Sequence, residues 1–151
     1  MQYMAIALLG LSASAAAQPP DGADPFCGDL RRVVAAAGER PAFASLPAEV
    51  GERGISMFGF SNGCGRYEAQ GRQVFGCYRQ LPPPELRVDI FAAQIARCLP
   101  TAERLPDAGP EGLFREHVVR FRIAGATIEA AEGGWRTAGG GRVTLVVRPG
   151  H

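Results

Sequence analysis

Hydrophobic residues recur at helical spacing in two stretches of the chain. In the first stretch one apolar stripe is formed by Phe26, Cys27, Leu30, Val33, Val34 and Ala37. Asp24 and Pro25 suit the N-cap and the first helical position, and Gly38 suits the residue just past the C-terminus. The pattern predicts a helix from Pro25 to about Ala37 whose stripe faces a core.

The second helical stretch lies between two prolines. Its broad apolar face consists of Leu86, Ile90, Phe91, Ile95, Cys98 and Leu99. Pro84 is tolerated in the first turn of a helix, whereas Pro100 ends one. We therefore expect a helix from about Glu85 to Leu99.

Alternation with a period of two predicts strands in the remaining segments. Residues 55–60 form a short strand pattern, with Asn62-Gly63 as a turn signal, and residues 64–79 predict a hairpin around Gln70-Gly71. Near the C-terminus, residues 118–123 and 143–148 alternate clearly and residues 127–131 more weakly. The segments 100–112 and 132–141 are rich in Pro or Gly and predict loops.

These elements together predict one α+β domain over residues 18–151. Its expected architecture is an antiparallel sheet of about five to six strands with two helices packed on one face. The expected order of elements is α-β-β-β-α-β-β-β.

Residues 1–17 have the pattern of a signal peptide. A short apolar run from Met4 to Leu11 is followed by small residues that end in Ala15-Ala16-Ala17, before Gln18. The run is shorter than the roughly 20 residues that span a bilayer. We therefore expect a mature protein of residues 18–151 without a membrane span, in the periplasm or secreted.

Four cysteines, Cys27, Cys64, Cys77 and Cys98, follow this leader. An even number of cysteines in an exported chain predicts two disulfides. A hairpin folded around Gln70-Gly71 sets Cys64 opposite Cys77, within disulfide reach, and leaves Cys27 for Cys98. The pairings 27–64 with 77–98 and 27–77 with 64–98 stay open from sequence alone.

Charge and motif spacing argue against several functions. The net charge is +1, and a near-neutral domain is a poor candidate for nucleic-acid binding. The cysteines lack the close spacing of a metal site or a thiol oxidoreductase, and no Gly-Lys-Ser/Thr follows the glycines of residues 133–141. We expect no metal, no cofactor and no nucleic-acid partner.

One motif suggests a hydrolase. Residues 59–63 match G-x-S-x-G, the nucleophile elbow of α/β-hydrolases, with Ser61 as the nucleophile. That elbow needs a helix after the serine, but here a hairpin pattern follows. A small envelope hydrolase that uses Ser61 is therefore the alternative to a protein without enzymatic activity.

Two further pairs of titratable residues are weaker candidates for a catalytic site. Glu116 and His117 are neighbours on an expected strand, so their side chains point to opposite faces. Glu129 and Glu132 are interpreted as solvated charges in a loop or at a sheet edge.

Arg120 and Arg122 share one face of an expected strand, and Arg148 or Arg142 joins them if the closing strand lies alongside. This face is either a solvated outer surface or an anion-complementary surface for an acidic protein or glycan. Trp135 either folds back onto the core or is an exposed contact residue.

The arrangement of elements resembles the small α+β fold of type III secretion chaperones. The cysteine layout has one residue in a leading helix, two across a hairpin, and Cys98-Leu99 at the end of a second helix. It is similar to that of small four-cysteine periplasmic proteins of bacteria. The resemblance implies a fold and a compartment but no catalytic residues. We expect an accessory or protein-interaction module with an unknown protein or anionic envelope partner.

Overall fold

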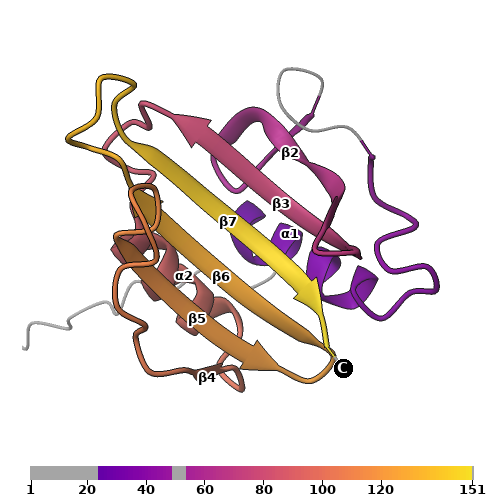
Figure 1. Cartoon of the computed structure of the whole chain (residues 1–151). Coiled ribbons are helices and arrows are strands. Elements are labelled where there is room, and N and C mark those ends of the chain that lie inside the picture. Colours follow the sequence, from indigo (N-terminus) through magenta and orange to yellow (C-terminus); the bar gives the residue numbers. More distant parts are fainter. Residues whose placement is uncertain (1–23, 49–53, 151) are drawn as a thin grey trace, which may run out of the picture.

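The computed structural model describes residues 24–48 and 54–150. The predicted signal peptide, residues 1–17, lies outside the described residues. Figure 1 labels the elements, which are α1 (Pro25–Ala36), β1 (Ile55–Met57), β2 (Phe60–Ala69), β3 (Arg72–Gln80), α2 (Val88–Cys98), β4 (Glu103–Arg104), β5 (His117–Ile123), β6 (Ala126–Gly133) and β7 (Arg142–Pro149).

All described strands belong to one antiparallel sheet of order β1-β2-β3-β7-β6-β5-β4. The strand that comes last in the chain, β7, lies at the centre (Figure 1). It joins the group β1–β3, which precedes α2, to the group β4–β6, which follows α2.

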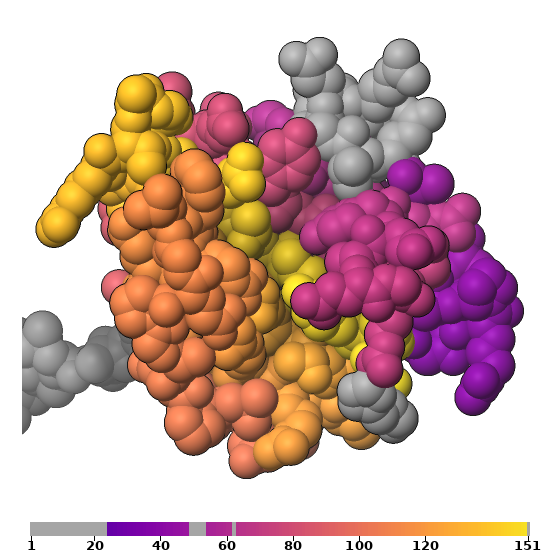
Figure 2. Space-filling model, in the orientation of Figure 1, coloured from indigo at the N-terminus to yellow at the C-terminus, as the bar shows by residue number. Residues whose placement is uncertain are grey.

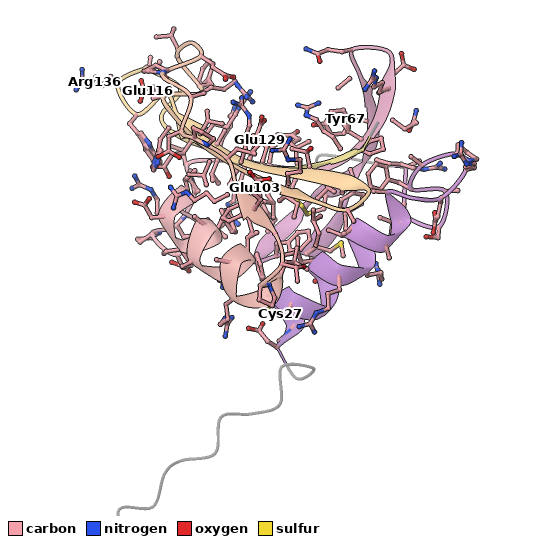
Figure 3. All side chains as sticks on the ribbon, turned by 90° about the horizontal axis from the view of Figure 1, so that it is seen from below. Cys27, Tyr67, Glu103, Glu116, Glu129 and Arg136 are labelled. Carbon is pink, nitrogen blue, oxygen red and sulfur yellow. A yellow bond between two sulfur atoms is a disulfide. The ribbon has the colours of Figure 1, made fainter. Side chains whose placement is uncertain are left out.

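The fold expected from the sequence, five to six strands with two helices packed on one face, is wrong. The described chain has seven strands that curl into a half-barrel, so that the molecule is mostly sheet (Figure 3). The additional strand is β4, whose two residues pair with Arg122 and Phe121 of β5. So short a strand is defined by backbone pairing alone, so no alternation of side chains predicts it.

The first turn of the sheet also lies elsewhere than expected. It is formed by Phe58 and Gly59, both with positive φ (55° and 81°), and Met57 pairs with Phe60 across it. The left-handed region is unfavourable for a bulky residue, but Phe58 is buried and its ring lies 5.2 Å from that of Phe26. Burial of this ring against α1 therefore outweighs the local turn signal, and Asn62 lies inside β2.

The hairpin around Gln70-Gly71 is confirmed. Both residues have positive φ (54° and 72°), and Ala69 pairs with Arg72 across them. The same register places Cys64 opposite Cys77, and these two residues form a disulfide.

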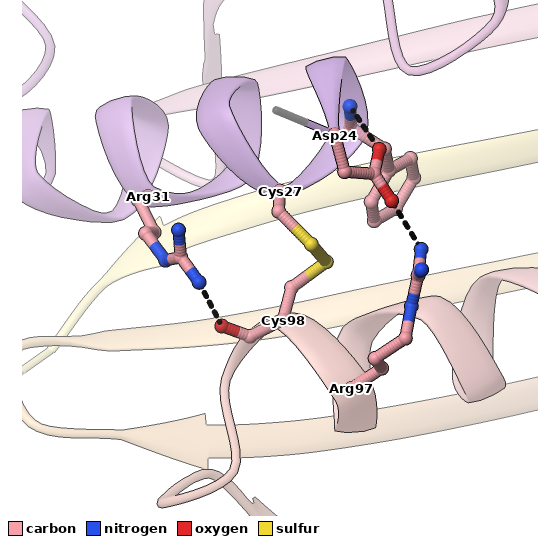
Figure 4. Close-up of a disulfide and its surroundings, with 6 residues drawn as sticks. Asp24, Cys27, Arg31, Arg97 and Cys98 are labelled. Atoms are coloured by element: carbon pink, nitrogen blue, oxygen red, sulfur yellow. Dashed lines mark hydrogen bonds and ion pairs between the residues drawn. A yellow bond between two sulfur atoms is a disulfide. The ribbon is translucent and has the colours of Figure 1, made fainter. Parts of the chain in front are cut away.

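The second disulfide, Cys27–Cys98, joins the first turn of α1 to the last turn of α2 (Figure 4). Arg31 donates to the Cys98 carbonyl at 3.4 Å, and Arg97 pairs with Asp24, the N-cap of α1. The preferred pairing of the four cysteines is thus confirmed, and two disulfides fit an extracytoplasmic protein. None of the described helices has both the length and the apolar character needed to cross a membrane.

The core lies between the helices and the facing side of the sheet. Four phenylalanine rings connect the elements, with Phe60 and Phe91 stacked at 5.6 Å and Phe26 between Phe58 and Phe91. The strand residues that face this core are largely aliphatic. Burial of these side chains stabilises the curled sheet, because each contributes roughly 1.5–3 kcal/mol.

Candidate functional site

The side of the half-barrel away from the helices is hollow. Figure 2 shows β7, in yellow, at the bottom of a hollow between the orange residues around β5 and the magenta residues of β2 and β3. Figure 3 shows Tyr67 and Glu129 on this side of the sheet. We call this hollow the trough.

Small residues form the trough floor. In one row across the sheet, Gly65 pairs with Gly76, Gly76 with Val146, and Val146 with Glu129. A Cβ at Gly76 would lie 3.0 Å from the ring and hydroxyl of Tyr67 and 3.2 Å from a Val146 methyl group. Tyr67 therefore lies directly over Gly76, in space that a side chain at that position would occupy.

A buried carboxylate organises the trough at one end. Glu129, 4% exposed, accepts hydrogen bonds from Arg115 and Arg120, both at 2.8 Å. The Arg148 guanidinium lies 3.8 Å from the same carboxylate. The Glu111 carboxylate also pairs with both Arg115 and Arg120, at 2.7 Å and 2.6 Å from their guanidinium groups.

The ionisation of this cluster follows from its contacts. Burial alone would raise the pKa of Glu129, but hydrogen bonds from Arg115 and Arg120 outweigh burial and hold that pKa below its ordinary value. The hydrogen bond to Glu129 raises the pKa of Arg115, and hydrogen bonds to Glu111 and then to Glu129 raise the pKa of Arg120. Each of these groups therefore carries its full charge near neutral pH.

Tyr67 contributes a neutral hydroxyl to the trough. Burial raises the pKa of Tyr67; the charge of Glu129 acts in the same direction, while Arg148 and Arg115 oppose it. The hydroxyl therefore stays protonated at neutral pH and can donate a hydrogen bond. Within residues 24–48 and 54–150, no hydrogen bond to this side chain is formed.

A pocket of about 780 Å³ occupies this end of the trough. Its charged lining residues are Arg72, Arg120, Arg122, Arg148 and Glu129. The rest of its wall comes from β2, β3, β5, β6 and β7 and from Gln70, Leu105, Gly125 and Gly150. Four arginines against one glutamate make the wall positive. The volume lies in the range of small-ligand sites.

The structure brings together part of the predicted arginine cluster. Arg120 and Arg148 both approach Glu129, whereas Arg122 is 61% exposed and pairs with Glu103 of β4 at 3.0 Å. Trp135 lies apart from them. Its ring occupies the space beside Gly141, with the Arg87 guanidinium 4.6 Å from the ring centre.

Two residues of the trough were missed or misread from the sequence. Glu129 was interpreted as a solvated charge but is buried, because β6 lies between β5 and β7. Tyr67 was not singled out. The signal available was its place in the predicted hairpin, where Tyr67 pairs with Val74 and so lies diagonal to Gly76.

The alternative catalytic residues are dispersed in the structure. Ser61 lies exposed within β2 rather than at a strand-to-helix turn, and its Oγ is 3.5 Å from an Arg79 nitrogen. Three strands separate β2 from β5, where His117 lies. The imidazole of His117 is 3.8 Å from Glu132 and 3.8 Å from Asp89.

Glu132 lies on the side of the sheet that faces the helices, and its hydrogen bonds there have a structural role. Its carboxylate accepts two hydrogen bonds from Arg87, both at 2.8 Å, and one from the Val88 amide at 3.1 Å. Because Val88 is the first residue of α2, the sheet itself caps this helix. This cap explains why α2 begins at Val88 and not at the expected Glu85.

Within the described residues, Asp24, Cys27 and Cys98 come close enough together to be considered as metal ligands. The two sulfurs are bonded to each other, so neither is a thiolate. The trough is therefore the feature of the described chain whose charge and shape best suit ligand binding. Neither a family model, nor a curated protein, nor a solved structure matches the chain, so its function rests on the geometry of the trough.

Proposed function

We propose that this chain is an extracytoplasmic binding module that holds an anionic group of a partner in the trough and performs no reaction on it. The observation that carries the proposal is the pocket wall, which contains four arginines and one buried glutamate, with Arg120 and Arg148 next to that glutamate. Guanidinium groups fixed by a carboxylate are pre-oriented for further carboxylate or phosphate oxygens. The neutral Tyr67 hydroxyl, which lies over Gly76 on the same side of the sheet, adds a donor beside the pocket.

Ionisation of the cluster supports binding over acid–base catalysis. A catalytic acid or base works best when its pKa lies near the operating pH. In the trough the pKa of Glu129 is lowered, while those of Tyr67, Arg115 and Arg120 are raised. These shifts move all four groups away from proton exchange at neutral pH.

The expected compartment is the periplasm or the exterior of the cell. Two buried disulfides suit an oxidising environment. The predicted signal peptide supports export.

The proposal is tested by calorimetric titration with a short glutamate peptide and, as its uncharged match, the corresponding glutamine peptide. We expect the glutamate peptide alone to bind, with an affinity that falls as salt is raised. Replacing Arg148 (Arg148→Gln) should weaken binding about tenfold, which corresponds to one charge-assisted hydrogen bond of about 1.4 kcal/mol.

Arg104→Gln is the control, since Arg104 pairs with Asp107 and does not line the pocket. Equal binding of the two peptides would overturn the proposal. Equal loss in Arg148→Gln and Arg104→Gln would do the same.

A further inference from the structure

The trough continues beyond the pocket along β7. Successive residues of a strand alternate between its two faces, so Arg142, Thr144, Val146 and Arg148 share the face on which Val146 meets Gly76. Arg148 lies at the pocket end, and Arg142 lies at the opposite end of the same strand. Both ends of the trough therefore carry a cation.

Aromatic rings from both walls hold the second cation. The Arg142 guanidinium lies 4.9 Å from the centre of the Phe114 ring and 6.0 Å from that of Tyr78. Tyr78 belongs to β3, on one side of β7, and Phe114 belongs to the segment before β5, on the other. Stacking between them orients the guanidinium without neutralising its charge.

Arg142 differs from four arginines of the trough in its lack of a counter-ion among the described residues. Arg115, Arg120, Arg122 and Arg148 each have a carboxylate within 4 Å. Arg142 has none among the residues that the structure describes, and its Nε is buried without a hydrogen-bond partner. A buried donor without an acceptor is unfavourable, and an incoming anion can offset that cost.

The distance between Arg142 and Arg148 and the residues of the trough floor together limit which ligand can reach both cations. Arg142 and Arg148 are six positions apart on one strand, about 20 Å at the rise of an extended chain. Between them the floor is formed by Gly76, which the Tyr67 ring covers, and by Ala131, Thr144 and Val146; Thr144 alone of these four has a polar side chain. Since β7 is hydrogen-bonded to β3 and β6, its backbone has no free edge to offer a ligand.

We propose that the occupant of the trough is an extended segment of an acidic protein with two carboxylates about six residues apart. Apolar side chains of the segment between them pack on the floor. An acidic glycan would instead place hydroxyl groups against Val146 and Ala131, whose side chains cannot accept or donate a hydrogen bond, while the neighbouring Thr144 hydroxyl already donates to the Ala131 carbonyl at 3.5 Å. This inference rests on the proposed function and adds the length and chemistry of the ligand.

The experiment compares two synthetic peptides by titration. One has two glutamates separated by five alanine or valine residues, which spaces the carboxylates by about 20 Å. The other has glutamine in place of one of the glutamates. We expect the two-acid peptide to bind about tenfold more tightly, the increment of one charge-assisted hydrogen bond.

Arg142→Gln should remove this tenfold advantage and leave binding of the one-acid peptide unchanged, whereas Arg148→Gln should weaken both peptides. Arg142→Lys keeps the charge but loses the planar stack, so it should retain part of the advantage. Arg136→Gln, an exposed change in the adjacent β6–β7 loop, is the control. Thermal unfolding of each variant confirms that it folds.

The two proposals fail in different ways. If Arg148→Gln weakens binding while Arg142→Gln has no effect, the pocket binds an anion and the two-ended ligand is wrong. If neither change has an effect, the proposed function itself fails. If an oligomer of galacturonic acid binds more tightly than the two-acid peptide and depends on Arg142, the trough is an acidic-glycan site and the protein partner is wrong.

Discussion

Glu129 and Glu132 lie three residues apart on β6, are both buried, and point to opposite sides of the sheet. Glu129 holds the arginines of the trough, while Glu132 holds Arg87 and the first amide of α2. One strand therefore positions both the candidate site and the second helix. The two carboxylates can be tested separately, because they share no partner among the described residues.

Replacing Glu132 with glutamine should destabilise the protein by about 2 kcal/mol, because Arg87 and the Val88 amide lose a charged acceptor. Chemical unfolding at neutral pH measures this difference. Glu116→Gln, an exposed neighbour of β5, is the control and should change the unfolding free energy by less than about 0.5 kcal/mol. A Glu132→Gln variant as stable as the control would contradict the role of Glu132 as a cap.

Acid should weaken the fold through the same two groups. Burial raises the pKa of both Glu129 and Glu132, but their arginine hydrogen bonds outweigh it and leave each pKa below the ordinary value of 4.5. Below about pH 4.5 the unfolded chain therefore binds protons that the folded chain does not. The stabilisation is complete at neutral pH and is lost as the pH falls through the folded values. Unfolding midpoints between neutral pH and about pH 3 should fall more steeply for the wild type than for Glu132→Gln.

Gly76→Ala should disturb the trough floor. The new methyl group would meet Tyr67 at 3.0 Å and Val146 at 3.2 Å, so Tyr67 must move away. We expect a loss of about 1 kcal/mol in stability and weaker binding of the glutamate peptide.

Gly28→Ala is the matched control for this change. Gly28 lies in α1, and a Cβ there would have nothing within 4 Å. Alanine should therefore stabilise the helix by about 0.5–1 kcal/mol and leave binding unchanged. A Gly76→Ala variant that binds as well as Gly28→Ala would show that Tyr67 does not contribute to binding.

The two disulfides should differ in their contributions to stability. Cys64–Cys77 spans 13 positions and Cys27–Cys98 spans 71. The entropy of loop closure gives about 3 kcal/mol for the short loop and about 4.5 kcal/mol for the long one. The double variant Cys27→Ala/Cys98→Ala should therefore unfold at lower denaturant concentration than Cys64→Ala/Cys77→Ala. The reverse order would mean that packing of the hairpin, and not loop length, dominates.

Ser61→Ala should leave both stability and any ester turnover of the purified protein unchanged. Ser61 is exposed on β2 and contacts Arg79 at 3.5 Å, without an acid–base partner among the described residues. A spectrophotometric assay with a generic ester measures turnover. Loss of a measurable activity in this variant alone would favour the hydrolase alternative.

Local signals in the sequence were sufficient for both helices, apart from the start of α2, and for the central hairpin. The apolar stripe of α1 is buried at Phe26, Leu30 and Val33, as its spacing predicts. Gly71 fixes the turn and so fixes the register that pairs Cys64 with Cys77. In both cases residues close in sequence determine the geometry.

The curvature of the sheet and the trough depend on contacts that a linear pattern does not contain. On β6, Ala130 and Ala131 point to opposite sides of the sheet and are both fully buried. Alternation is therefore weak in this strand, and Glu129 gave the pattern of a surface charge. Arg120 and Arg122 could be placed on one face from their spacing, but the buried glutamate between Arg120 and Arg148 required the β5–β6–β7 pairing.

The central position of β7 sets the order in which the molecule can be completed. During synthesis β1–β3 and β4–β6 emerge before β7, and neither group contains a strand that joins it to the other. Arrival of β7 closes the gap between the two halves and, in the same step, lays the floor on which a partner would rest. A chain that lacks β7 would therefore lack the floor of the trough and, with it, the proposed binding surface.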